Sequence, residues 1–347
     1  MILVAKLESD NLLFRLLIVN QLNCRELLKL MRVAVIDMGT NTFHLLIVDV
    51  IEEDFKVLYR EKIAVRIGKD GINKGLITSD AWERALNTLK TFKSVTQDFE
   101  VDEIYATATS AIRNAKNGKD LVNAINKETG ISTRIISGIE EAEYIYFGVK
   151  RAMKIGEETA LIMDIGGGSI EFILASDNQI HWLQSFEIGG QRMVEQFHHH
   201  DPIIPEELSN LENYIFEKLQ PLFDAIVKHQ PTTLIGSSGT FDTLSEIHCH
   251  KKNISIDPEL TEFPLTVASF EEIFQDLVSK NREERLKIKG MIPLRVDMIV
   301  VATATIKYII DTCGLEKIRV SAFALKEGVL LKTIDQLQKD NRLAQKD

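Results

Sequence analysis

The strongest constraint on the fold is a hairpin pattern that occurs twice, at residues 35–47 and 162–174. In each copy an apolar segment ends in Asp-x-Gly, turns through small polar residues and resumes as a second apolar segment. The two aspartates, Asp37 and Asp164, are separated by 164 − 37 = 127 residues, which is the length of a domain. Chance similarity of two apolar hairpins is the alternative. The polar and apolar positions recur in register, so the pattern favours a duplicated domain.

The segments after each hairpin follow a similar order. After the first, the sequence predicts strands within 55–67, a helix over 81–96, a strand over 103–107, a helix over 118–130, a strand over 133–137 and a helix over 140–150. The second copy restarts this order and includes a strand over 233–236. A last helix is predicted over 321–343, with Gly328 as its single turn breaker. We therefore predict two related α/β domains with a cleft between them.

The predicted domain boundaries follow from this order. Residues 1–30 are predicted to be an N-terminal extension that adds at most one amphipathic helix. Residues 31–137, with the C-terminal helix at about 321–347, form the first domain, and residues 138–320 form the second.

Composition narrows the class of protein. The chain is 45% hydrophobic and 27% charged, which is typical of a globular protein, and its formal net charge is −10. A polyanionic ligand must therefore be attracted by local cations, and non-specific nucleic-acid binding is not expected. No apolar run approaches the roughly 20 residues of a membrane span, and no signal-peptide cleavage site follows the first apolar run. Three cysteines without CxxC spacing (Cys24, Cys249 and Cys313) indicate a reducing, cytoplasmic location.

Three glycine-rich turns, at residues 37–41, 164–169 and 236–240, each come directly after a predicted strand. Open α/β sheets bind phosphates at this position, where backbone N–H groups point into a crevice. The aspartate at each of the first two strand ends suits a metal ion. The predicted phosphate-binding residues are Gly39, Thr40, Asn41, Gly166, Gly167, Gly168, Ser169, Gly236, Ser237, Gly239 and Thr240, and the predicted metal ligands include Asp37 and Asp164.

Several acidic residues lie near these turns. Glu140, Glu141 and Glu143 open a predicted helix, where carboxylates either stabilise the helix N-terminus or supply a general base for water. Residue types alone do not decide between the two. Glu171 lies on the strand that leaves the second turn, and it is either a solvated residue or a further metal ligand.

Basic residues and histidines are weaker candidates. Arg113 is predicted to open a helix, where its charge opposes the helix dipole and calls for an anion such as phosphate. Arg66 and Arg295 are weaker candidates for the same role, with a position on the surface as the default for both. A zinc site at residues 198–200 or 248–250 is not favoured, because neighbouring histidines diverge in direction. His44 is either close to the cleft or an ordinary strand residue.

The chain resembles the exopolyphosphatase and guanosine pentaphosphate phosphohydrolase family, in its short two-domain form. That family belongs to the actin, sugar kinase and heat-shock chaperone superfamily, whose members contain two duplicated ribonuclease-H-like domains with a central cleft. The matching segments begin at Asp37 (DMGTNTFHLL), Ala106 (ATATSAIRNA), Ile136 (ISGIEEA), Asp164 (DIGGGSIE), Ile188 (IGGQRM) and Gly236 (GSSGT). Their order and spacing fit from about residue 32 to about residue 335.

The resemblance implies roles for individual residues. It implies that Glu141 is the catalytic base, that Glu171 helps to place metal and water, and that Asp164 is associated with Mg²⁺. It implies that Arg113 contacts phosphate and that residues 166–169 form the phosphate loop. The implied enzyme hydrolyses phosphoric anhydrides and releases the terminal phosphate of inorganic polyphosphate, the 5′-phosphate of pppGpp in the stringent response, or both. The implied partners are the substrate and, at most, a second copy of the chain.

Two departures and two alternatives accompany this resemblance. The family usually shows SDGALREG near its end, where this chain has SAFALKEG at 321–328, and Ala302 stands where a glycine is usual. The departures bear on the far end of the substrate or on packing of the last helix. The alternatives are a kinase that transfers phosphoryl to a small acceptor and a non-catalytic protein that binds alarmones or polyphosphate.

Overall fold

The computed structural model describes residues 30–344, except residues 53, 256 and 258. The predicted extension at residues 1–30 lies, apart from Leu30, outside the described residues, as does Cys24.

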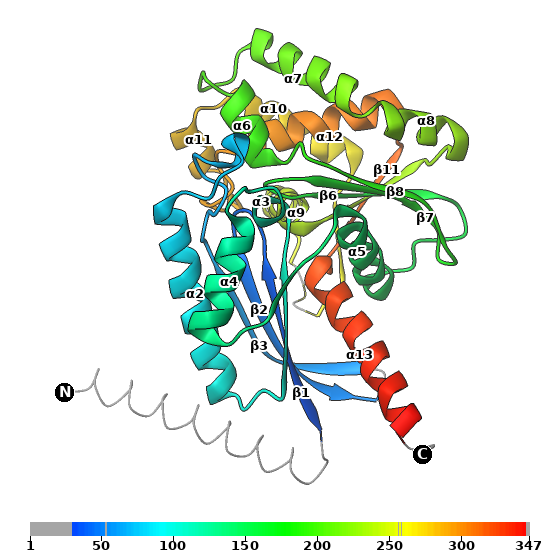
Figure 1. The fold of residues 1–347 in the computed structure, drawn as a ribbon. Helices are drawn as coiled ribbons and strands as arrows, with labels where there is room; N and C mark the ends of the chain where they lie inside the picture. Colours follow the sequence, from blue (N-terminus) through cyan, green and yellow to red (C-terminus); the bar gives the residue numbers. More distant parts are fainter. Residues whose placement is uncertain (1–29, 53, 256, 258, 345–347) are drawn as a thin grey trace, which may run out of the picture.

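Two β-sheets of the same topology organise the structure (Figure 1). The first contains β1 (Met31–Met38), β2 (Phe43–Ile51), β3 (Asp54–Ile63), β4 (Glu103–Ala108) and β5 (Thr133–Ile135) in the order β3-β2-β1-β4-β5. The second contains β6 (Ala160–Ile165), β7 (Ile170–Ala175), β8 (Ile180–Phe186), β9 (Thr233–Ser237) and β11 (Lys317–Ser321) in the order β8-β7-β6-β9-β11, with β10 (Glu262–Phe263) added at its edge.

The strand directions also agree between the two sheets. β1 pairs antiparallel with β2 and parallel with β4, just as β6 pairs antiparallel with β7 and parallel with β9. The same order and directions in both sheets confirm the predicted pair of duplicated ribonuclease-H-like domains. We call the parts built on the first and second sheets the first and second lobes.

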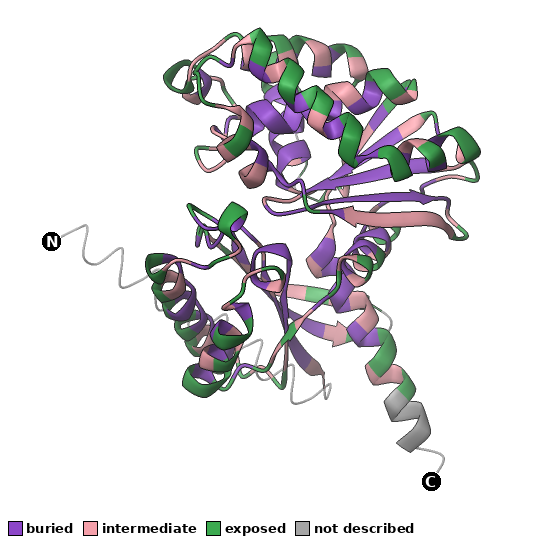
Figure 2. Ribbon diagram, turned by 45° about the horizontal axis from the view of Figure 1, so that its top comes forward, coloured by how far each residue is buried: buried purple, intermediate pink, exposed green. Residues whose placement is uncertain are grey.

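Helices cover the outer face of each sheet. In the first lobe these are α2 (Ser79–Asp98), α3 (Ser110–Arg113) and α4 (Gly118–Thr129), preceded by the short 3-10 helix η1 (Ile72–Lys74). In the second lobe they include α6 (Gly190–Phe197), α7 (Pro205–Lys218), α8 (Gln220–His229), α9 (Ser238–Lys252), α10 (Val267–Val278), α11 (Arg282–Leu286) and α12 (Ile299–Cys313). The outer helices are green on their solvent side and purple toward the sheets (Figure 2). This division reflects amphipathic helix faces.

Two further helices lie between the sheets, α5 (Gly138–Ala152) and α13 (Leu325–Ala344) (Figure 1). α5 packs on β7 and β8 of the second lobe, whereas α13 packs on β1 and β2 of the first. The two helices also pack closely on each other. A Cβ on Gly148 would lie 2.2 Å from the Ala324 carbonyl oxygen, and one on Gly328 would lie 1.7 Å from the Tyr144 carbonyl oxygen. Gly328, predicted only as a turn breaker, therefore permits the helix crossing.

Two local predictions were wrong. The last helix begins at Leu325 and not at residue 321, because Lys317–Ser321 form β11 and the Ser321 hydroxyl bonds the backbone of Phe323. Arg113 ends the short helix α3 and does not open a helix, so its charge is favourable to the helix dipole. The helix dipole therefore gives no reason to expect an anion beside Arg113.

Within the described part of the chain, no helix combines the length and the apolar character needed to cross a membrane.

Candidate active site

The carboxyl ends of β1 and β6 and the start of α9 meet at a cavity of about 130 Å³ between the lobes. Twelve residues predicted for the site line it: Asp37, Gly39, Thr40, Asn41, Glu141, Asp164, Gly166, Gly167, Gly168, Ser169, Glu171 and Gly239. The structure therefore brings together residues that are up to 239 − 37 = 202 positions apart.

Four predicted residues do not line the cavity: Arg113, Gly236, Ser237 and Thr240. Gly236 lies beneath the Phe241 ring, so close that a Cβ would be 2.0 Å from it. Ser237 is fully buried and donates a hydrogen bond from Oγ to Asp164 Oδ2 at 2.7 Å. At this turn the cavity is lined instead by Ser238, whose φ is 66°. Gly236 and Ser237 thus support the wall of the cavity from behind.

The first two glycine turns have the same local geometry. The Gly39 N–H donates to the Thr42 carbonyl at 3.1 Å, and the Gly166 N–H donates to the Ser169 carbonyl at 3.0 Å. The two turns also meet across the cavity, because a Cβ on Gly167 would lie 2.4 Å from Asn41 Nδ2. Glycine is needed here for close approach of the lobes. Such turns present amide groups of the kind that bind phosphate oxygens.

Five carboxylates line this cavity: Asp37, Glu141, Asp164, Glu171 and Asp242. Burial raises the pKa of Asp37 to about 7 and that of Glu141 to about 7. Burial also raises the pKa of Asp164 and raises that of Glu171 well above its ordinary value, with Glu141 as a further cause for Glu171. Like charges held together in a dry site resist full ionisation, so these carboxyl groups do not all carry a charge at neutral pH.

The neighbouring acids of α5 have different roles. Glu140 forms a capping box with Ser137, and it pairs with Arg134 on the surface. Glu141 faces the cavity and is 6% exposed. The two acids therefore differ: Glu140 stabilises the helix N-terminus, whereas Glu141 points into the cavity.

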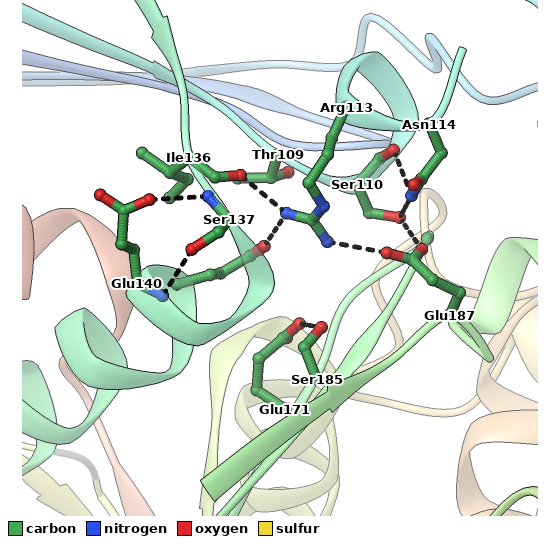
Figure 3. A network of polar contacts seen from close by, with 12 residues as sticks. Thr109, Ser110, Arg113, Asn114, Ile136, Ser137, Glu140, Glu171, Ser185 and Glu187 are labelled. Carbon is green, nitrogen blue, oxygen red and sulfur yellow. Dashed lines mark hydrogen bonds and ion pairs between the residues drawn. The ribbon is translucent and has the colours of Figure 1, made fainter.

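Glu171 is buried and not solvated, being 1% exposed. Ser185 Oγ donates a hydrogen bond to Glu171 Oε1 at 2.7 Å (Figure 3). Its position on β7 places it opposite Asp164 in the register of β6 and β7. The two carboxylates therefore lie on paired strands beside the second glycine turn.

Arg113 approaches the site from the first lobe and is held by carboxylates (Figure 3). Its Nη1 donates to Glu141 Oε2 at 2.8 Å, and its Nη2 donates to Glu187 Oε1 at 2.9 Å. The charge that we expected to need a phosphate thus already has two anionic partners.

Sequence reasoning missed most of the cations of the site. Lys62 and Lys326 line the cavity, and so does Arg295, for which the sequence offered a phosphate contact as the weaker alternative to a surface position. Among the described residues the buried Arg295 Nε has no hydrogen-bond partner, and its guanidinium packs against Gly239. Asp242 faces this group, and burial raises its pKa to about 6. Lys326 lies in the segment 321–328, where the sequence departs from the usual family pattern. That departure was the one sequence signal for this part of the cavity lining.

Of the histidines considered in the sequence, one lies in the cavity and the others do not. His44 lines the cavity, and its Nε2 lies 2.9 Å from Thr42 Oγ1; burial lowers the pKa of His44 far below its ordinary value. Away from the cavity, His200 pairs with Glu207 at 2.9 Å. Among the residues that the structure describes, no three His, Cys, Asp or Glu side chains form a group arranged to hold a metal ion.

Two sheets of one topology, with paired glycine turns facing each other across a cavity, define the actin-like class of duplicated α/β proteins. Within that class the chain belongs to the Ppx/GppA phosphatase family, whose model matches residues 46–337. The predicted resemblance is therefore confirmed, and membership places the chain among hydrolases of phosphoric anhydrides.

Individual relatives agree with this assignment. The crystal structure of an exopolyphosphatase from Cytophaga hutchinsonii is 46% identical, with a TM-score of 0.86, over 88% of this chain and 98% of that one. A protein of Haemophilus influenzae named as a putative exopolyphosphatase is 27% identical over 86% of this chain and 90% of its own length. An Aquifex aeolicus family member shares the fold, with 24% identity and a TM-score of 0.72 over 90% of this chain and 99% of that one.

Proposed function

We propose that this protein is an exopolyphosphatase that releases the terminal phosphate of inorganic polyphosphate, with Glu141 as the base that activates water. Guanosine pentaphosphate presents the same kind of terminal phosphoryl group, and we propose it as the second substrate. The exopolyphosphatase from Cytophaga hutchinsonii, at 46% identity, supports the first substrate.

The observation that carries this proposal is the environment of Glu141. The carboxylate faces the cavity opposite the glycine turns, and its pKa of about 7 suits a base that works near neutral pH. Arg113 donates to Oε2, which leaves Oε1 to accept a proton from water. The turn amides, Lys326 and Arg295 line the same cavity, and we propose that they stabilise the negative charge that develops on the transferred phosphoryl group.

Mg²⁺ suits this donor set. Asp37 Oδ1 is buried and has no hydrogen-bond partner in the described part of the chain, which leaves a lone pair for a cation. We propose Asp37, Asp164 and Glu171 as the residues that would hold the ion, directly or through water. Mg²⁺ commonly takes only one or two carboxylates and completes its shell with water and substrate phosphates, so it needs no cage of three protein ligands. When bound, it would neutralise charge on the substrate's phosphate oxygens.

The test replaces Glu141 by glutamine. Because general-base catalysis contributes about 10²- to 10⁴-fold, we expect kcat of Glu141→Gln to fall by that order. Glu140→Gln is the matched control: it lies one residue away, caps the helix and should keep at least half of the activity. Phosphate release at the wild-type rate by Glu141→Gln would contradict the proposal.

The same assay ranks the substrates. Phosphate release is measured with Mg²⁺ from tripolyphosphate, long-chain polyphosphate and pppGpp at equal concentrations of terminal phosphoryl groups. We expect release from polyphosphate. If phosphate were released from pppGpp and not from polyphosphate, pppGpp would be the substrate and polyphosphate would not.

A further inference from the structure

Arg113, which belongs to the first lobe, lies between two carboxylates, one on α5 and one just after β8 (Figure 3). Its Nη1 donates to Glu141 Oε2 at 2.8 Å and to the Ile136 carbonyl at 3.2 Å, both in the segment that starts α5. Its Nη2 donates to Glu187 Oε1 at 2.9 Å. The guanidinium is thereby held at both of its terminal nitrogens.

Glu187 is well placed to act as an anchor. It lies in the second lobe, between the end of β8 and the start of α6. Its Oε2 accepts hydrogen bonds from Ser110 Oγ and, at 3.3 Å, from Arg192 Nη2. Burial alone would raise its pKa, but hydrogen bonds from Ser110, Arg113 and Asn114 lower the pKa below the ordinary value. Glu187 is therefore ionised at neutral pH.

The contact joins the two lobes. Ser110 and Arg113 belong to α3 of the first lobe, whereas Glu187 and Arg192 belong to the second. Arg192 extends the junction, because its Nη1 donates to the Ile72 carbonyl of η1 at 3.1 Å. Arg192, Glu187, Arg113 and Glu141 thus form a chain of alternating charges that is complete only when the lobes are together.

We infer that Glu187 is a positioning residue for the hydrolysis: it fixes the Arg113 guanidinium against Glu141 when the lobes meet. This inference rests on the proposed role of Glu141 as the base. Glu187 does not line the cavity, so it acts through Arg113 and not on the substrate. An arginine side chain is long and flexible, and a second anchor on Nη2 restricts the guanidinium to the orientation that keeps Nη1 on Glu141. Glu141 then presents its other oxygen to water in one geometry.

The first experiment is a double-mutant cycle. Because misplacement of a catalytic group costs on the order of 10- to 100-fold, we expect Glu187→Ala to lower kcat at least tenfold, with KM changed less than threefold. In an Arg113→Ala background the same substitution should have no further effect, because the interaction that it removes is already absent. An equal loss of kcat in both backgrounds, or none in the wild type, would overturn the inference.

Glu195→Ala is the matched control. Glu195, on α6, also joins the lobes, since Asn73 Nδ2 donates to its Oε2 at 3.0 Å, but it does not contact Arg113. We expect its kcat to stay within twofold of the wild type. Should Glu187→Ala fail to fold, Glu187→Gln keeps the size of the side chain, and a fall in kcat without a rise in KM is expected there too.

The second experiment does not depend on activity. With ¹⁵N-labelled arginine, slow rotation of a doubly anchored guanidinium gives separate Nη signals for Arg113. Those signals should average in Glu187→Ala and stay separate in Glu195→Ala. Averaged signals in the wild type would overturn the positioning role, whereas separate signals in a wild type that releases no phosphate would count against the proposed function only.

Discussion

At the scale of single residues, Glu140 and Glu141 illustrate how the backbone assigns chemistry. The capping box with Ser137 and the exposed partner Arg134 keep Glu140 at the helix end. One residue later, the helix turns Glu141 into a cavity where burial raises its pKa to about 7. A carboxyl group with this pKa is half-ionised near neutral pH, so its reactivity depends on the charges around it.

This environment predicts the pH dependence of the reaction. Glu141, as the proposed base, must be deprotonated, so kcat/KM should rise with pH through about 7 in the wild type. Arg113→Ala removes a cation 2.8 Å from Glu141, which disfavours the carboxylate and raises its pKa. We expect the acidic limb of the profile to move to higher pH by about one unit or more.

The control for this profile is Arg134→Ala. Arg134 pairs with the capping residue Glu140 on the surface, so its loss should leave the limb in place. A limb that stays unmoved in Arg113→Ala would show that Glu141 is not the group that titrates.

At the scale of elements, turns and helices together build the site. The sequence predicts where the turns lie, but it does not predict how the helices pack. The two Asp-x-Gly turns could be predicted because each is a local pattern that ends a strand, and both line the cavity. Lys62 and Lys326 could not, because they reach the cavity only through the pairing of β3 and the packing of α13. The packing of α5 on the second sheet also depends on contacts distant in sequence.

The crossing of α5 and α13 makes a specific prediction about stability. A Cβ on Gly328 or Gly148 meets a backbone carbonyl of the other helix, and backbone atoms cannot move aside. We expect Gly328→Ala to lower the free energy of unfolding by about 1–3 kcal/mol or more, as overpacking of a core does. The measurement is denaturant unfolding monitored by circular dichroism.

Gly190→Ala is the control for that measurement. A Cβ at this first residue of α6 would have its nearest neighbours at 3.6 Å, an ordinary contact. Its unfolding free energy should change by less than 1 kcal/mol, given the helix preference of alanine over glycine. An equal loss in Gly328→Ala and Gly190→Ala would mean that the helix crossing is not tightly packed.

At the scale of the whole molecule, opposite charges meet at the cavity while the protein as a whole repels a polyanion. The net charge is −10, yet Lys62, Arg295 and Lys326 line the cavity. Carboxylates line the same cavity. Binding of an anionic substrate together with a divalent cation would neutralise both sets of charges at once, so each ligand should promote binding of the other.

This cooperativity is measurable as a thermal shift. In the Glu141→Gln protein, which should bind without turnover, saturating Mg²⁺ and tripolyphosphate together at about 100 times the Kd stabilise the folded state by about 2.7 kcal/mol. We expect a clear rise in Tm with both ligands and a smaller one with either alone. Asp37→Asn in the same background should reduce the effect of Mg²⁺. Equal shifts with and without Mg²⁺ would contradict the proposed metal site.

The exchange of helices between the lobes has a further consequence. Each glycine at the crossing lies four residues after the carbonyl that the other approaches, since 148 − 144 = 4 and 328 − 324 = 4. Swapping the two helices therefore maps the contact onto itself, as a twofold axis does. With α5 on the second sheet and α13 on the first, the arrangement is that of an isologous, domain-swapped dimer joined into one chain. The two halves differ within this symmetry, because Glu141 lies on the helix that follows the first repeat and Lys326 on the helix that follows the second.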